Sequence, residues 1–157
     1  MIRGYFNNEE ESKLAFKTED AVRWIHAGDR GHIDEDGVIC FEDRLKRMLV
    51  RHDGFKVYPS KIESVIASLP QVDACCVVDV ADAGHVQGQL PFAFIVPNRE
   101  KDDNAHKLEE ALAEACRSGL PEHSQPCGFA FITEIPLTPV GKVDYLALKE
   151  MTALDEA

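Results

Sequence analysis

The clearest candidate for chemistry in this sequence is a lysine at the end of a segment with prolines and a glycine, residues 136–142. Pro139 fixes one backbone torsion and Gly141 supplies freedom at the end of the segment, so a tight turn is predicted there. The turn would present Lys142 on a short exposed loop, as a compact charge with three donors on a long stem. Such a group suits the charge that develops when a carboxylate attacks a phosphate. Taken alone, the same residue would be a solvated lysine on a turn.

Other catalytic motifs are missing from the sequence. It has no G-x-S-x-G elbow, no H-E-x-x-H zinc motif, and neither G-x-x-x-x-G-K-[ST] nor G-x-G-x-x-G nucleotide loops. The six histidines have no spacing typical of metal ligands. Each is interpreted as a surface residue or a residue satisfied by its neighbours, and no metal site is predicted.

Near the N-terminus, the pattern predicts a helix followed by a connection. Asn8, with Glu11 three residues later, is typical of a helix start. The side chains expected on the buried face of this helix are those of Leu14, Ala15 and Phe16. Residues 20–28 are interpreted as a connection that carries the only tryptophan, Trp24.

A hairpin is predicted next, with strands around 31–33 and 38–41 and a turn at Asp34–Gly37. The same stretch resembles a calcium loop. Its first ligand would be His32, however, and its last would be the short side chain of Asp43 instead of a bidentate glutamate. Because strands and not helices are expected on both sides, the hairpin turn is the preferred interpretation.

From about Val50 onward, the predicted order is hairpin, helix, strand, strand, helix, strand, loop and helix. The expected elements are hairpin strands at 47–51 and 55–58 with a tip at 52–54, a helix with a Ser60–Glu63 capping box, strands at 73–80, 92–96 and 128–133, a helix around 108–116 capped by Asp103 or Asn104, and a final helix capped by Asp144. This order indicates an α+β fold, a small and mostly antiparallel sheet with packed helices, preceded by a hairpin-containing remnant of a larger domain.

Composition limits the classes of partner. The chain has 157 residues, 45% hydrophobic and 29% charged, which fits one ordinary domain, or one small domain with an attached fragment. A formal net charge of -11 argues against nucleic acid and against anionic membranes. No apolar run approaches the ~18 residues of a membrane span, and the acidic start is unlike a signal peptide. The five cysteines form no C-x-x-C pair, so a cytoplasmic chain with mostly buried, reduced thiols is expected.

Three segments, in order, resemble the adenylate-forming superfamily of acyl-CoA synthetases, luciferases and peptide-synthetase adenylation domains. They are residues 2–10 with 24–37, residues 43–46 with 54–63, and residues 136–144. The resemblance implies that residues 1–43 are the end of a large N-terminal domain and that 44–157 form the mobile C-terminal domain. Each segment is modestly specific, whereas their joint order is strong.

The resemblance implies a role for five residues. Lys142 would be the catalytic lysine, Asp29 would accept hydrogen bonds from the ribose hydroxyls, and Arg44 would contact the ribose or the phosphate. Lys46 would be the interdomain hinge, and Gly54 would let its hairpin approach the pantetheine arm of coenzyme A. A carboxylic acid and Mg-ATP would give an acyl-adenylate and pyrophosphate, and rotation about the hinge would then bring the hairpin in for thioester formation.

The sequence departs from the family pattern in places. Ala27 stands where many members have threonine, and the span from Arg44 to Pro59 is one residue longer, so the alignment of Gly54 is weaker. The phosphate loop and acyl pocket are absent, so ATP, magnesium and the acid would be bound mainly by the missing N-terminal domain. The chain alone is predicted to be inactive, and strands exposed by the loss of that domain could pair in a dimer.

Two alternatives to an acid–CoA ligase remain open. One is an amino-acid-activating domain that loads the thiol of a carrier protein, although no carrier domain follows in this sequence. The other is a stand-alone docking module without catalysis, which would not need Lys142, Asp29 and Arg44 together. The identity of the acid cannot be inferred, because its pocket is not in these residues.

Overall fold

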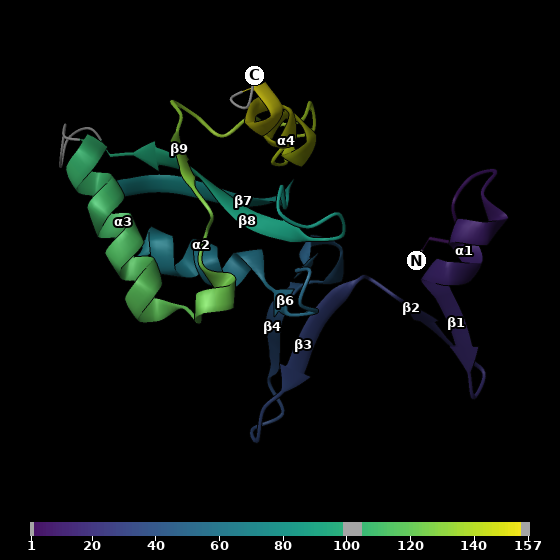
Figure 1. Cartoon of the computed structure of the whole chain (residues 1–157). Helices are drawn as coiled ribbons and strands as arrows, with labels where there is room; N and C mark the ends of the chain where they lie inside the picture. Colours follow the sequence, from purple (N-terminus) through teal and green to yellow (C-terminus); the bar gives the residue numbers. More distant parts are fainter. Residues whose placement is uncertain (1, 99–104, 155–157) are drawn as a thin grey trace. The chain divides into compact units, whose positions relative to one another are not determined.

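Residues 2–98 and 105–154 are described by the structure, a computed structural model, and the chain divides into two compact units. The first unit is Met1–Lys46 and the second is Arg47–Ala157. Figure 1 labels their elements. The capping residue predicted for the third helix, Asp103 or Asn104, lies outside the described residues.

The first unit consists of one short helix and two hairpins. Its elements are α1 (Glu9–Ala15), β1 (Phe16–Glu19), β2 (Val22–Ile25), β3 (Asp29–Ile33) and β4 (Ile39–Arg44), followed by the 3-10 turn η1 (Leu45–Arg47) at the division. The predicted helix start is confirmed, since Asn8 Oδ1 accepts a hydrogen bond from Glu11 N at 3.1 Å. The predicted buried face is wrong: α1 buries none of its residues, and Leu14 is 73% exposed. Within this unit α1 contacts β1, but this contact leaves every residue of the helix at least partly exposed.

The connection predicted for residues 20–28 is wrong in its first half. Residues 22–25 form β2, which pairs antiparallel with β1. The turn between the strands is only Asp20 and Ala21, both with positive φ, 49° and 59°. These are the torsions of a two-residue hairpin turn. An Asp-Ala pair lacks the glycine that usually marks such a turn, so the sequence pattern does not reveal the hairpin.

The hairpin predicted around Asp34–Gly37 is confirmed, with β3 and β4 on either side of the turn. Asp34 Oδ1 accepts hydrogen bonds from the backbone N–H groups of Asp36, at 3.0 Å, and Val38, at 2.8 Å. The carboxylate is therefore used to close the turn.

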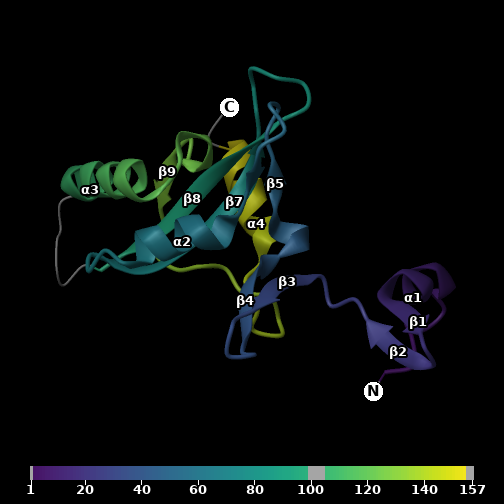
Figure 2. The same ribbon diagram turned by 90° about the horizontal axis from the view of Figure 1, so that it is seen from below.

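The second unit is built around one sheet. Strand β7 (Val72–Ala81) pairs antiparallel with β8 (Gln89–Pro97), and β9 (Phe129–Phe131) joins β8 in parallel, giving the order β7-β8-β9. In Figure 1, α2 (Pro59–Ala67) and α3 (Ala105–Gly119) lie on one side of this sheet, and α4 (Tyr145–Leu154) lies on the other. In the view from below, α2 crosses in front of the sheet (Figure 2). The remaining elements are β5 (Leu49–Val50), β6 (Lys56–Val57) and the 3-10 turn η2 (Glu122–Ser124).

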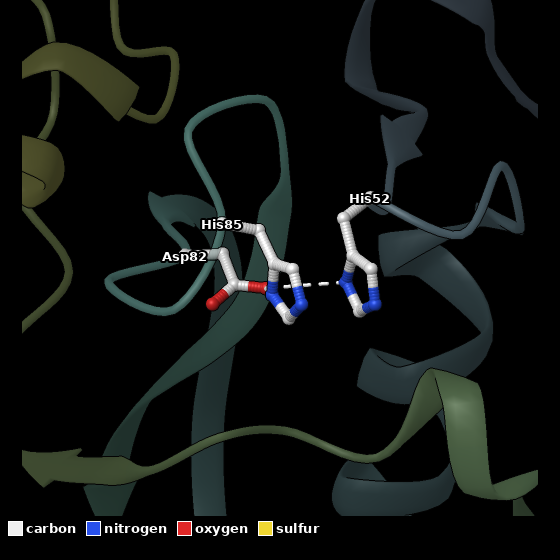
Figure 3. A group of neighbouring side chains, drawn as sticks. All are labelled: His52, Asp82 and His85. Atoms are coloured by element: carbon white, nitrogen blue, oxygen red, sulfur yellow. Dashed lines mark hydrogen bonds and ion pairs between the residues drawn. The ribbon is translucent and has the colours of Figure 1, made fainter.

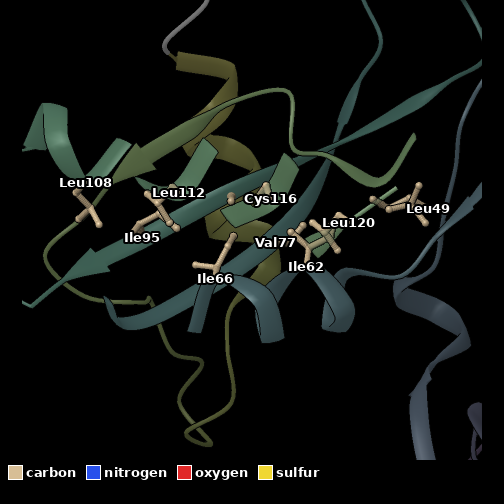
Figure 4. Packing of buried hydrophobic residues seen from close by; sticks show 11 residues of the cluster. Leu49, Ile62, Ile66, Val77, Ile95, Leu108, Leu112, Cys116 and Leu120 are labelled. Carbon is tan, nitrogen blue, oxygen red and sulfur yellow. The ribbon is translucent and has the colours of Figure 1, made fainter. Parts of the chain in front are cut away.

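Two cores lie on the two faces of the sheet, because successive strand residues point to opposite sides. Val77 belongs to the core shared with α2 and α3, drawn in Figure 4, where Ile62, Ile66 and Leu112 are fully buried. Its neighbours Cys76 and Val78 belong to the other core, in which α4 places the fully buried Leu148.

The predicted fold class is confirmed, since the unit is a mostly antiparallel α+β arrangement. The predicted strands and helices of this unit are all present, although the hairpin strands β5 and β6 are only two residues each. None of the described helices is both long and apolar enough to cross a membrane.

The capping box predicted for α2 is wrong. Tyr58 is the N-cap, makes no side-chain capping bond, and Pro59 occupies the first turn, where a missing N–H is harmless. Glu63 instead turns toward the sheet: its Oε1 accepts a hydrogen bond from Val77 N at 2.9 Å. Arg47 binds Glu63 through both terminal nitrogens and donates to Val77 O at 3.2 Å.

This ion pair covers the outer edge of β7. Val77 uses its N–H and C=O on the side away from β8, where an edge strand would otherwise expose them. The Arg47 guanidinium also lies 4.7 Å from the centre of the Tyr145 ring. Arg47, the first residue of the second unit, is therefore fixed to α2, β7 and α4 at once.

None of the five cysteines is assigned to a disulfide, and the prediction that most are buried holds only in part. Cys76 and Cys116 are buried, Cys40 and Cys75 are half-buried, and Cys127 is exposed. Desolvation, reinforced by the Glu63 carboxylate, raises the pKa of Cys75 to about 11 and of Cys76 to about 12. These two thiols therefore stay protonated at neutral pH and are poor nucleophiles.

Candidate functional site

The Lys142 loop is a tight hairpin turn. Gly141 N donates to Thr138 O at 2.8 Å, Thr138 N donates to Lys142 O at 2.6 Å, and Lys142 N donates to Thr138 Oγ1 at 3.2 Å. Gly141 has a φ of 76°, which suits a turn that closes through a left-handed glycine. Leu137 and Val143 form a β-bridge directly outside the turn.

The loop is fixed at its base by α4. Asp144 Oδ1 accepts from the backbone N–H groups of Leu146 and Ala147 at 3.2 and 3.1 Å, so it caps the helix as predicted. Asp144 N donates to Pro136 O at 2.8 Å, which ties the start of the loop to its end. Leu148, one turn into the helix, is buried in the core on that face of the sheet. The turn is therefore held by a folded scaffold, while its lysine is exposed.

The Lys142 side chain has no ion-pair or hydrogen-bond partner among the described residues. Lys149 on α4, by contrast, forms an ion pair with Asp79. An exposed, unpartnered ammonium on a rigid turn is available to an anionic group brought from outside the unit.

Asp29 and Arg44 are directly opposite each other in the first unit. They are Cα partners in the β3–β4 ladder, and Arg44 Nε lies 3.1 Å from Asp29 Oδ1. The ion-pair partner of the Arg44 side chain is therefore Asp29 and not the adjacent Asp43. The Asp43 carboxylate is buried, and its Oδ1 accepts from the backbone Arg44 N at 2.7 Å. Leu45 N donates to Gly28 O at 2.8 Å, which closes the strand pair beside them. The structure thus brings together the two residues predicted to bind nucleotide.

Lys46 is exposed and lies in η1, and its side chain forms no ion pair or hydrogen bond among the described residues. The division between the two compact units falls between Lys46 and Arg47. Asp29, Arg44 and Lys46 are in the first unit, and Gly54 and Lys142 are in the second.

Gly54 is in the tip of the β5–β6 hairpin, which has the same hydrogen-bond pattern as the Lys142 loop. Gly54 N donates to Arg51 O at 2.9 Å, Arg51 N donates to Phe55 O at 3.0 Å, and Gly54 has a φ of 81°. A Cβ added at Gly54 would meet no atom within 4 Å, so the position faces open space. Desolvation acts to raise the pKa of the neighbouring Asp53, but the Phe55 N–H and the Arg51 guanidinium lower it overall.

The structure brings together three residues that the sequence analysis did not connect. His52 from the hairpin tip meets Asp82 and His85 from the β7–β8 loop, as Figure 3 shows. The hydrogen bond with His85 lowers the pKa of Asp82, so this carboxylate is ionised at neutral pH. Asp82-x-x-His85 is the only local signal of the cluster, and its third member is thirty residues away in the sequence.

Comparison with known proteins places this chain in a family. Residues 61–142 match the AMP-binding enzyme C-terminal domain. The 4-coumarate–CoA ligase-like 1 protein of Arabidopsis thaliana is 32% identical over 143 residues, which is 91% of this chain and 24% of that protein. The long-chain-fatty-acid–CoA ligase FadD13 of Mycobacterium tuberculosis is 31% identical over 150 residues, which is 96% of this chain and 27% of that protein.

A solved structure gives the same result. The ATP-bound MatB from Rhodopseudomonas palustris superposes with a TM-score of 0.77 at 28% identity, covering 95% of this chain and 28% of that one. The chain thus spans about a quarter of the length of the relatives that it matches.

Proposed function

Because this chain belongs to the family of AMP-binding enzyme C-terminal domains, in the adenylate-forming superfamily, we propose that it is the mobile part of an ATP-dependent acid–CoA ligase. Such a ligase would first convert a carboxylic acid and ATP into an acyl-adenylate and pyrophosphate. It would then transfer the acyl group from AMP to the thiol of coenzyme A. The names of the relatives, which are CoA ligases, favour coenzyme A over a carrier protein as the thiol acceptor.

The observation that carries this proposal is the Lys142 loop, a hydrogen-bonded turn with an exposed ammonium group that has no partner among residues 2–98 and 105–154. In the adenylation step, an oxygen of the substrate carboxylate attacks the α-phosphorus of ATP and pyrophosphate leaves. Both reacting groups are anionic, so Lys142 would lower the barrier by neutralising charge between them. The scaffold from Leu137 to Leu148 would hold the ammonium in place without reorganisation.

Asp29 and Arg44 would bind the adenylate from the first unit. A carboxylate has two acceptor oxygens, which suit the two neighbouring hydroxyls of a ribose. The ion pair with Arg44 engages Oδ1 of Asp29 and holds the carboxylate in one orientation. Arg44 itself is more exposed, which leaves its guanidinium accessible to the ribose or the phosphate.

Rotation of the second unit about Lys46 would switch the active site from adenylation to thioester formation. The division of the chain directly after Lys46 supports this role, as does the fixed position of Arg47 on the other side. An exposed side chain can remain in water while the backbone torsions change. After rotation, the hairpin around Gly54 would approach the pantetheine arm, and the open space at Gly54 supports a close approach of the thiol substrate.

The remaining parts of the active site would belong to a large N-terminal domain, which would bind most of the ATP, its magnesium ion and the acid. Residues 1–43 would be the end of that domain. Several apolar side chains of the first unit are more than half exposed, which supports the proposal that a further domain covers them. They include Trp24, Ile33, Ile39 and Phe41. We therefore expect no adenylation by this chain alone, and we expect its exposed strands to promote pairing between chains.

The test uses the ligase in which this chain is joined to its large domain. Adenylation is followed by acid-dependent pyrophosphate exchange, and thioester formation by acyl transfer from preformed acyl-adenylate to coenzyme A. Lys142→Ala should slow adenylation by roughly 100-fold or more, the effect of removing one group that stabilises developing charge, and slow thioester formation by less than about 10-fold. Lys149→Ala, which alters a paired lysine on α4, is the matched control and should change neither step.

Equal losses in both half-reactions of Lys142→Ala would refute the proposal that Lys142 acts in adenylation and not in thioester formation. Acyl transfer only to a carrier-protein thiol would identify an amino-acid-activating or carrier-loading enzyme instead. Full activity of the large domain without this chain would support a docking module.

A further inference from the structure

A compact cluster of two imidazoles and a carboxylate lies on the second unit, and none of its three side chains is used above for the ligase chemistry. His85 Nδ1 lies 2.8 Å from Asp82 Oδ2, and His52 Nδ1 lies 3.3 Å from the same oxygen. One ligand atom from each residue lies within 4.8 Å of the other two. Figure 3 shows both rings directed at the Asp82 carboxylate.

We propose that His52, Asp82 and His85 form a binding site for a divalent transition-metal ion of the zinc type. Imidazole nitrogens and a carboxylate oxygen are the donors that such ions select, at about 2.0–2.2 Å. Ligand atoms at those distances in a tetrahedral site are separated by roughly 3.3 Å, close to the spacing of the cluster. Water would complete the coordination, as it does where a protein supplies three ligands.

The carboxylate is held in place before any ion binds. The Asp82 side chain is only 10% exposed, and its Oδ1 accepts from Gly84 N at 2.9 Å. Backbone bonds from Asp82 N to Gly88 O and from His85 N to Asp82 O, each 3.0 Å, close the loop around it. Oδ2 is thereby turned toward the two histidines, so the ordering of this ligand is already achieved in the folded protein.

The hairpin tip lies close to the β7–β8 loop because Gly88 has no side chain there. A Cβ added at Gly88 would lie 3.0 Å from His52 Cβ and 3.1 Å from His52 N, so a side chain at position 88 would push the tip away. One residue on, Gln89 Oε1 accepts from Val50 N at 3.2 Å, and Gln89 Nε2 donates to Asp79. The approach of His52 to Asp82 thus depends on several contacts and not on one flexible side chain.

The two imidazole rings are stacked face to face, with centroids 3.5 Å apart and planes 2° apart. Parallel rings cannot both direct a lone pair at one ion, so one ring must turn on binding. His85, 49% exposed, has the room to do so.

A bound ion would join the β5–β6 hairpin tip to the β7–β8 loop. Amide hydrogen exchange should therefore slow at Gly54 and Asp82, whose N–H groups close these two loops, when zinc is added. This readout does not require the ligase reaction, so the metal site and the proposed function can fail independently.

The experiment is a calorimetric titration of the chain with Zn²⁺ in a buffer that does not bind metals. We expect one saturable site in the unsubstituted chain, and affinity reduced by at least about tenfold in Asp82→Asn, His85→Ala and His52→Ala, the lower end of the effect of disturbing a metal's ligand environment. The matched control is His106→Ala, which removes a histidine paired with a single carboxylate, Glu110, on the exposed face of α3. Its affinity for zinc at the proposed site should be unchanged.

Circular dichroism confirms that each variant is folded, and Asp82→Asn, which preserves size, keeps the test valid if an alanine variant unfolds. The proposal is overturned if the chain shows no saturable zinc binding, or if Asp82→Asn and His85→Ala bind as the unsubstituted chain does. In either case the cluster is a hydrogen-bonded contact between two loops only.

Discussion

The ion pair between Arg47 and Glu63 is expected to be a main determinant of stability in the second unit, and Glu63→Leu tests this. The substitution removes the acceptor of Val77 N and the partner of both terminal nitrogens of Arg47. Both charged side chains are only 21% exposed, so water can replace the lost bonds only in part.

The magnitude follows from the number and burial of the bonds. Hydrogen bonds to charged groups contribute about 1.5–3 kcal/mol each, but bonds that share one carboxylate are not additive. Breaking a buried pair by removing one partner costs roughly 3–5 kcal/mol. Because some water reaches this pair, we expect Glu63→Leu to lower the free energy of unfolding by about 3 kcal/mol. Glu63→Gln, which can still accept from Val77 N, should lower it by about 1.5 kcal/mol.

The assay is urea unfolding at neutral pH, followed by far-UV circular dichroism. Most of the helical signal comes from the second unit, whereas Trp24, the only tryptophan, reports on the first unit by fluorescence. Glu114→Gln is the matched control, because Glu114 pairs with Arg117 on the exposed face of α3. A surface pair of this kind contributes only about 0.5 kcal/mol.

A double-mutant cycle with Arg47→Met isolates the pair itself. The interaction energy between Arg47 and Glu63 should be about 1–2 kcal/mol, within the range for residues in one network. Losses below about 0.5 kcal/mol in both Glu63 variants, comparable to Glu114→Gln, would refute the reasoning. They would mean that water satisfies the edge of β7 as well as the ion pair does.

Three further outcomes are expected. Ile66→Ala, at a fully buried position between α2 and the sheet, should lower the free energy of unfolding in urea by about 3–4 kcal/mol, and a loss under about 1 kcal/mol would contradict close packing there. Gly141→Ala should lower it by about 1 kcal/mol, because the φ of 76° disfavours a Cβ although no atom obstructs it; no loss would show that the turn changes conformation. Stability should also fall at alkaline pH. The pKa values of Cys75 and Cys76 are raised from 9.0 to about 11 and about 12, so the folded state holds protons that the unfolded state releases. The resulting stabilisation is complete below pH 9 and is lost as the pH rises toward 11–12; urea titrations across this range should show a smaller loss in the Cys75→Ala, Cys76→Ala double variant.

The local features of the candidate site could be predicted from the sequence. Three loops close with the same pattern, a carbonyl at the first position accepting from a glycine three residues later, at Gly37, Gly54 and Gly141. A glycine at that place is a local requirement of the backbone, so the sequence marks it. The cap of α4 by Asp144 is equally local, since a side chain reaches only its next two or three residues.

Strand and helix types in the second unit were also accessible to prediction, because their apolar periodicity reflects burial on a sheet or under a helix. The start of α2 could not be predicted in this way. Ser60 and Glu63 have the spacing of a capping box, but the Glu63 side chain bonds to Val77 instead. The Glu63 carboxylate binds the half-buried Arg47 and the Val77 N–H at the edge of β7. Both contacts depend on the tertiary structure, so the local sequence does not reveal them. A local propensity of about 1 kcal/mol does not prevail over several charge-assisted hydrogen bonds.

The sequence by itself determined that a lysine follows a rigid turn and that the chain carries ordered segments resembling the adenylate-forming superfamily. The tertiary structure decided which side chains meet. It set the β3–β4 register that places Asp29 opposite Arg44, and it brought His52 close to Asp82 and His85, an approach that the lack of a side chain at Gly88 favours. Turns and caps depend on neighbours within a few residues, whereas such clusters depend on strand register and on the close approach of distant loops, which no local pattern encodes.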